Sequence, residues 1–192
     1  MRVVSALILG LTVTTGTAFA QESREQIDNP FANPLKSSGQ SAACSEGPVS
    51  AFGRYIGEWN FQDSQISADG QSWTEGAGGQ WDFYCLGEGI AIQDFWQPKA
   101  GGFGTTLRMY NPKSDSWDVV FTGEGSQAMS RLTATQNADG SVEMHYVTPE
   151  FSPARRITFS TPDEEGFDWE LSISSDNKQT WTTVYKMKVT PR

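Results

Sequence analysis

The chain has 192 residues, a formal charge of −9, and 37% hydrophobic against 19% charged residues. This length predicts about one domain with a core of useful size. The composition excludes a highly charged, disordered chain. Proteins that bind nucleic acids cluster Lys and Arg against the phosphates, so the acidic balance speaks against a nucleic-acid partner.

Residues Met1–Ala20 have the pattern of a secretory signal peptide. Arg2 supplies the positive charge, Val3–Leu11 is an apolar run, and Ala18-Phe19-Ala20 is an A-x-A cleavage site. The alternative is a membrane anchor, but the apolar run is shorter than the ~20 residues that cross a bilayer. We therefore expect an exported protein that does not insert into the membrane.

The chain contains two cysteines, Cys44 and Cys85. An exported protein meets oxidising conditions, which favour a disulfide between them. The alternative is a catalytic or metal-binding thiol. Such a site usually recruits histidines, and the chain has one His, so we expect neither a metal site nor a reactive cysteine.

The mature chain divides into an N-terminal arm, residues 21–43, and a folded domain, residues 44–192. The arm is rich in Ser, Gln, Asn and Pro and shows no periodicity. In the domain, a short helical turn is expected near residues 48–55, and glycines at 76, 78 and 79 indicate a bulge. Ten segments bounded by turn signals are predicted as strands: residues 55–63, 73–85, 89–97, 104–110, 117–122, 128–136, 142–147, 155–160, 167–174 and 180–190.

The predicted fold class is all-β, an up-and-down antiparallel β-barrel of about ten strands. Consecutive strands joined by short turns close economically on themselves, which removes exposed sheet edges. A two-sheet sandwich is the alternative, but it usually needs longer crossover connections than this chain offers.

Gly57-Glu58-Trp59, at the first predicted strand, resembles the G-x-W motif that opens lipocalins and related calycin barrels. In those proteins the Trp closes the floor of the barrel, and a basic residue near the end of the last strand packs over it. The resemblance implies that Arg192 or Lys188 takes that place here.

A second resemblance covers residues 52–192, essentially the whole domain. Its motifs are Thr105-Thr106-Leu107-Arg108-x-Tyr110-x-Pro112, Trp117-x-Val119-x-Phe121 and Trp169-Glu170-x-x-x-Ser174-x-Asp176-x-x-x-Thr180-Trp181. They are similar to a family of bacterial calycin-like barrels that is largely of unknown function. The resemblance implies a barrel from a bacterium, located in the periplasm or secreted. The chain departs from the pattern in Lys178, where Gly is typical, and in its cysteines.

The segment Ser174-x-Asp176-x-x-x-Thr180-Trp181 also resembles the Asp-box of sialidases. The physical role of this motif is a hairpin turn, in which the Asp accepts backbone N–H bonds. It is a structural device, and the chain is too short for a sialidase propeller.

A barrel of eight to ten strands can hold a small ligand. The candidate ligand-binding residues are aromatic and charged residues of the predicted strands: Trp81, Trp96, Arg108, Tyr110, Arg156 and Glu170. In this hypothesis the arginines meet an anionic end of the ligand and the tryptophans cover its apolar part. The alternative is that each Arg pairs with Glu170, Asp94 or Asp82 without any ligand. Trp59 and Trp181 are expected in the core.

Catalytic motifs are lacking. His145 shares a strand face with Glu143 and Val147, so an exposed strand His is expected rather than a haem ligand. A carboxylate pair such as Asp94 with Glu170 would serve acid–base chemistry only if both shared a cavity. We therefore predict no cofactor and no metal.

The sequence thus predicts an exported barrel that binds a small amphipathic or anionic molecule. The first alternative is a cofactor-independent lyase, isomerase or hydrolase, which a raised carboxyl pKa in the cavity would favour. The second is an envelope interaction module that docks through residues 21–43, which a large exposed apolar patch beside a filled barrel would favour. The ligand's identity and the oligomeric state stay open.

Overall fold

The structure is a computed structural model that describes residues 42–192. The predicted signal peptide, residues 1–20, and nearly all of the predicted arm lie outside the described residues. The described chain begins with two 3-10 turns, η1 (Ala42–Cys44) and η2 (Gly47–Val49), followed by the short helix α2 (Ser50–Gly53). The helical turn predicted near residues 48–55 is therefore confirmed. Among residues 42–192, no helix is long and apolar enough to cross a membrane.

The remaining described residues form eleven strands joined mostly by short turns. They are β1 (Gly57–Ile66), β2 (Trp73–Glu75), β3 (Gly79–Leu86), β4 (Ala91–Pro98), β5 (Gly104–Asn111), β6 (Ser116–Gly123), β7 (Ser130–Gln136), β8 (Val142–Thr148), β9 (Ala154–Phe159), β10 (Phe167–Ser174) and β11 (Thr182–Pro191).

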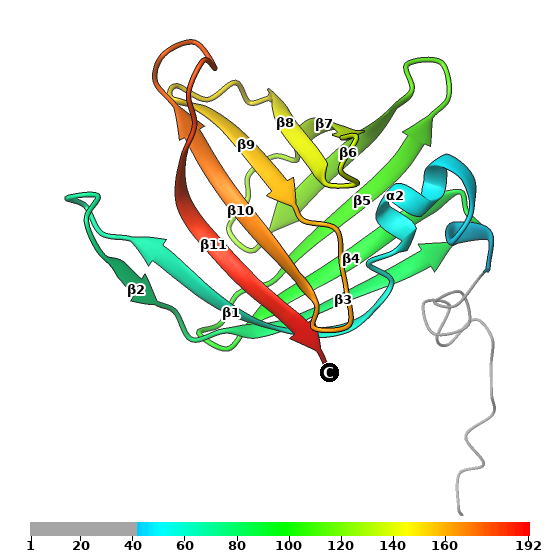
Figure 1. The fold of residues 1–192 in the computed structure, drawn as a ribbon, viewed down its shortest axis with the longest axis horizontal. Coiled ribbons are helices and arrows are strands. Elements are labelled where there is room, and N and C mark those ends of the chain that lie inside the picture. The colour runs from blue at the N-terminus through cyan, green and yellow to red at the C-terminus, as the bar shows by residue number, and fades with distance from the viewer. Residues whose placement is uncertain (1–41) are drawn as a thin grey trace, which may run out of the picture.

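The strands close into an up-and-down antiparallel barrel. From β3 to β11 each strand pairs with the next in sequence, β1 pairs with β3, and β11 returns to pair with β1 (Figure 1). Ten strands form the closed wall, because β2 only extends the pairing along the far half of β1. The predicted fold class is confirmed, and closure leaves the long strands without exposed edges.

The second predicted strand is interrupted where its glycines indicated a bulge. β2 ends at Glu75 and β3 begins at Gly79, and Gly78 between them has a φ of 66°, a left-handed conformation that suits glycine. A Cβ at Gly76 would lie 2.1 Å from the Asp63 carboxylate. The interruption therefore lets Asp63 accept a hydrogen bond from the Gly78 N–H (2.9 Å).

One end of the barrel is closed by the segment that contains α2 (Figure 1). Phe52 is fully buried, and its ring packs edge-on against Trp117 and Phe159 at centroid distances of 4.9 and 5.7 Å. We call this closing segment, residues 42–55, the plug. Tyr55, predicted as the start of the first strand, is instead its last residue and donates a hydrogen bond to the Ser160 carbonyl (2.8 Å). The strand begins two residues later, at Gly57.

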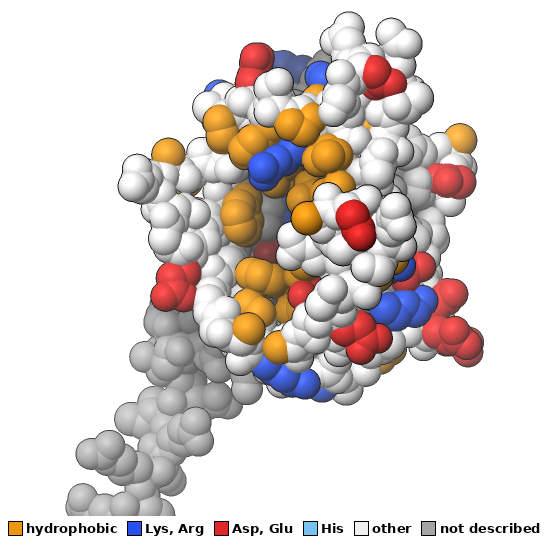
Figure 2. All heavy atoms as spheres, turned by 90° about the vertical axis from the view of Figure 1, so that its left-hand side faces the viewer, with side chains coloured by type: hydrophobic (Ala, Val, Ile, Leu, Met, Phe, Trp, Pro, Cys, Tyr) orange, Lys and Arg blue, Asp and Glu red, His pale blue; other side chains and the backbone are white. Residues whose placement is uncertain are grey.

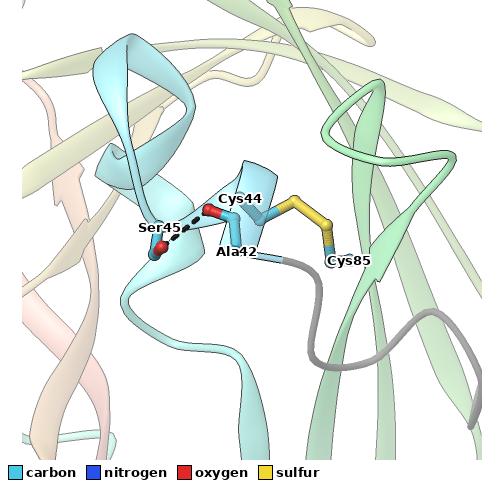
Figure 3. The surroundings of a disulfide bond; sticks show 4 residues. All are labelled: Ala42, Cys44, Ser45 and Cys85. Carbon is cyan, nitrogen blue, oxygen red and sulfur yellow. Dashed lines mark hydrogen bonds between the residues drawn. A yellow bond between two sulfur atoms is a disulfide. The ribbon is translucent and has the colours of Figure 1, made fainter.

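A disulfide ties this plug to the barrel wall. Cys44 in η1 is bonded to Cys85 in β3, and both residues are fully buried (Figure 3). The turn around Cys44 is held by Ser45, whose hydroxyl donates to the Ala42 carbonyl (2.7 Å). The predicted pairing is confirmed, and the bond is typical of an oxidising, extracytoplasmic environment.

The G-x-W segment forms the first three residues of β1, shortly after the segment that closes the barrel. Trp59 is buried, as expected, and its indole donates to the Tyr55 carbonyl (2.8 Å). Arg192 bridges the carboxylates of Glu58 (2.9 Å) and Asp82 (3.1 Å) and so fastens the C-terminus to β1 and β3. Lys188 instead faces Asp168 on the surface (3.4 Å). Of the two basic residues that the lipocalin resemblance implied, Arg192 is the one next to the G-x-W segment.

Candidate functional site

The barrel is not filled by its own side chains. A cavity of about 340 Å³ lies within it, and Figure 2 shows a hollow lined with hydrophobic side chains on the face away from α2. Twelve of the fifteen lining residues are apolar or aromatic: Trp81, Trp96, Phe121, Leu132, Met144, Tyr146, Ile157, Phe159, Trp169, Leu171, Tyr185 and Met187. The other three are Asp94, Thr106 and Arg108. The volume falls in the range of about 300–1,000 Å³ that is usual for small-molecule sites.

The charged residues of the cavity form a buried ion pair. Arg108 on β5 donates through Nη2 to Oδ2 of Asp94 on β4 at 2.5 Å, and both side chains are 1% exposed. In the β4–β5 register Arg108 lies opposite Ile92 and Thr106 opposite Asp94, so strand alternation directs both charged residues inward. The Thr106 N–H donates to Oδ1 of Asp94 (3.0 Å). Both carboxylate oxygens are therefore engaged.

The guanidinium of Arg108 lies on the aromatic layer that closes the barrel. Its central carbon is 4.8 Å from the ring centroid of Phe52, 5.4 Å from that of Phe83 and 5.7 Å from that of Phe159. The flat faces of these rings attract a cation, which offsets part of the cost of burying it. This contact places the ion pair at the floor of the cavity, directly above the plug.

Several buried donors of the cavity have no hydrogen-bond partner among the described residues. They are Nε and Nη1 of Arg108 and the indole nitrogens of Trp81 and Trp96. The two tryptophans lie opposite each other in the β3–β4 register. The Trp81 ring contacts Phe83 (4.9 Å) and Phe159 (5.7 Å), the same rings that carry the guanidinium. Arg108 and Trp81 thus share two ring neighbours, whereas the Trp96 ring stacks on Phe61 (5.8 Å). Buried donors without partners are uncommon.

The wall above this floor carries two tyrosines. Burial raises the pKa of the Tyr146 hydroxyl. Burial, and then its hydrogen bond to Asp63 (2.8 Å), raise the pKa of Tyr185. Both side chains therefore stay uncharged at neutral pH, and the Arg108–Asp94 pair supplies the charge in the cavity lining.

The structure brings together three of the predicted ligand-binding residues: Trp81, Trp96 and Arg108. Tyr110 shares the inward face of β5 but lies beyond the cavity. Its ring packs on Trp117 (5.8 Å) and its hydroxyl donates to Asp115 (2.6 Å) in the β5–β6 turn.

The other two predicted residues are on the outer surface of the barrel. Arg156 pairs with Glu143 (3.1 Å), and its guanidinium lies over the ring of Trp181 (4.5 Å). Glu170 accepts a hydrogen bond from the Thr183 hydroxyl (3.0 Å). Neither lines the cavity, so a carboxylate pair of Asp94 with Glu170 does not share it either.

Trp181 was expected in the core, and this expectation is wrong. The residue precedes β11 and is half-buried between Arg156 and His145. His145 lies on the same outer surface, 32% exposed and bonded to Glu143 (2.5 Å), as expected for a strand histidine.

Sequence reasoning did not single out much of the apolar wall, notably Phe159, Trp169 and Tyr146. The available signal was alternation on β8, β9 and β10, because each of these residues is two positions from another lining residue: Ile157, Leu171 and Met144. No protein-family model matches the chain, and no curated protein is similar to it in sequence. What the structure confirms is a closed up-and-down antiparallel barrel of ten strands.

Proposed function

We propose that this protein binds one small amphipathic molecule inside its barrel. The observation that carries the proposal is the set of unpartnered N–H donors of Arg108, Trp81 and Trp96 among the lining residues of a largely apolar cavity. Burying such donors without partners costs free energy, and an oxygen-bearing end of a ligand would satisfy them. The apolar remainder of the ligand would be covered by the wall.

Two features favour binding over the alternatives. The cavity lining contains one carboxylate, Asp94, which is bound by Arg108 and Thr106, so the lining does not hold the carboxylate pair that acid–base chemistry would use. An interaction module would be expected to have a filled barrel, whereas this barrel contains a cavity with a hollow opening on one face (Figure 2).

The protein is further proposed to act after export, in the periplasm or outside the cell. The Cys44–Cys85 bond supports an oxidising compartment. The segment Met1–Ala20 would direct export and be removed. The mass of the protein recovered from that compartment should correspond to a chain that begins at Gln21, and a full-length mass would contradict this part of the proposal.

The first test is native mass spectrometry of the protein purified from its own compartment, before and after denaturation. A small molecule that leaves only on unfolding supports the proposal. The second test uses the uncharged fluorescent ketone prodan, whose emission shifts in apolar surroundings. Wild-type protein should bind it with a one-to-one stoichiometry.

Matched variants locate the bound probe. Met144 is buried in the cavity wall, and Met144→Trp should fill the cavity and weaken prodan binding at least tenfold. Met109 is 46% exposed on the outer face of β5, and Met109→Trp should leave binding unchanged. Leu171→Trp, at a half-buried lining position, repeats the test if Met144→Trp folds poorly. Equal prodan affinity in all folded variants would refute binding inside the barrel.

A further inference from the structure

The electrostatics of the cavity floor select the polar end of the ligand. We propose that this end is an uncharged oxygen acceptor, the carbonyl of a ketone, aldehyde, ester or amide, and not a carboxylate or phosphate. The inference rests on the proposed function and narrows it to one class of ligand, since the sequence alone leaves amphipathic and anionic molecules equally open.

The first step is the charge balance. An arginine alone at the floor would attract an anion, but Asp94 already neutralises Arg108 through a direct contact of 2.5 Å. The pair is net neutral, and among the fifteen lining residues no other Arg, Lys, Asp or Glu is present to balance a second anion. A ligand carboxylate would therefore add an uncompensated negative charge next to Asp94.

The second step is the cost of desolvation. Both members of the pair are 1% exposed, and the guanidinium lies on the rings of Phe52, Phe83 and Phe159. An anion that enters this environment loses its hydration and is repelled by Asp94. An uncharged carbonyl loses far less hydration for the same position. The acidic protein as a whole, with a formal charge of −9, adds a weaker repulsion of the same sign.

The third step is hydrogen-bond complementarity. The unpartnered groups of the cavity lining are donors only: Nε and Nη1 of Arg108 and the indole N–H groups of Trp81 and Trp96. They fit an oxygen with lone pairs and cannot accept from a hydroxyl or an amine. A carbonyl oxygen has two acceptor sites and can take bonds from the guanidinium and from an indole at once. The uncharged indole donors, together with a cation that Asp94 already neutralises, therefore favour a carbonyl oxygen as the bound group.

The test compares two ligands of the same size that differ only at this end. 2-Undecanone and decanoate share the same alkyl chain, and a methyl group in the ketone replaces one carboxylate oxygen. Binding is measured by isothermal titration calorimetry at pH 8 and low salt. We expect the ketone to bind wild-type protein at least tenfold more tightly. Equal affinities, or tighter binding of decanoate, would overturn the inference while leaving the proposed function standing. Binding of neither ligand would overturn both.

A variant tests the stated cause. In Asp94→Asn the amide oxygen can still accept from the Thr106 N–H, but the charge of Arg108 is no longer neutralised. The preference should shift by at least tenfold toward decanoate, and an unchanged preference would overturn the role of Asp94. A measurement on wild type alone serves if this variant is unstable: decanoate should bind more tightly as the pH falls through the fatty acid's own pKa, because the uncharged acid is the form that fits.

A second pair of variants tests the donors. Trp81→Phe removes an unpartnered indole N–H from the cavity floor and keeps an aromatic ring there. It should weaken binding of 2-undecanone about fivefold. Trp169→Phe makes the same substitution at a lining residue whose indole nitrogen is not among the unpartnered buried donors, and it should have a smaller effect. A larger loss in Trp169→Phe would contradict the assignment of the carbonyl end to the floor.

Discussion

Replacing Arg108 should destabilise the barrel more than replacing one member of a surface ion pair. Arg108→Met leaves the Asp94 carboxylate 1% exposed without its cation, and removing one partner of a buried pair costs about 3–5 kcal/mol. In a domain of this size 1 kcal/mol corresponds to about 2–4 °C in Tm, so we expect a fall of roughly 10 °C. Differential scanning calorimetry and urea denaturation measure the loss directly.

Two comparisons isolate the cause of this loss. Asp94→Asn added to Arg108→Met removes the buried charge while keeping an acceptor for Thr106, and it should recover more than half of the lost free energy of unfolding. Arg156→Met makes the same change on the outer surface, where the partners are about one-quarter exposed, and should cost at most about 1 kcal/mol. The reasoning fails if Arg108→Met is as mild as Arg156→Met, or if the double variant is no more stable than the single one.

Three further changes have defined outcomes. Replacing Cys44 and Cys85 by Ala removes a disulfide that spans 41 residues, and it should lower the free energy of unfolding by about 4 kcal/mol in urea titrations. Under reducing conditions, where the wild type also lacks the bond, this difference from wild type should disappear. Phe52→Ala should cost about 3–5 kcal/mol by calorimetry, because the ring fills the plug. Hydrogen bonds from Thr180, first its hydroxyl and then its N–H, lower the pKa of Asp176, so its carboxylate stabilises the fold above the unfolded-state pKa of about 4. That stability is lost as the pH falls toward the lower folded-state pKa, and unfolding curves of wild type and Asp176→Asn should converge below about pH 4.

Much of the fold could be predicted from the sequence because the turns contain residues whose side chains hydrogen-bond within the turn. Asp139 and Asp176 accept bonds from the residues that follow them, as their turn patterns indicate, and so fix where the adjacent strands end. Short turns then require neighbouring strands to pair in order, and closure follows from the need to cover edges. The break at Gly76–Gly79 could likewise be predicted, because a run of glycines inside a strand indicates a bulge or the close approach of neighbouring chain.

The site was only partly predictable, for a physical reason. Alternation tells which residues share a face of a strand but not which face is inward, so Arg108 and Arg156 looked equivalent although one lies at the cavity floor and the other on the surface. On β10, Glu170 and the buried Ser172 lie on the same outer face, where both contact the Thr183 hydroxyl, and the register with β11 shifts between Leu171 and Ser172. Nothing in the sequence marks this bulge.

The Arg108–Asp94 pair is costly for a protein that needs only to fold. Apolar residues of similar volume often stabilise a fold as well as or better than a buried ion pair, and each unpartnered buried donor costs about 1–3 kcal/mol more. Here two nitrogens of Arg108 and the indoles of Trp81 and Trp96 remain unpartnered within the described residues. A bound molecule that satisfies them offsets this cost through binding linkage. At a ligand concentration one hundred times Kd, the gain is about 2.7 kcal/mol, which corresponds to a rise in Tm of roughly 5–10 °C. If 2-undecanone at that concentration does not raise the Tm, it does not bind the folded protein in preference to the unfolded chain, and the proposed compensation fails.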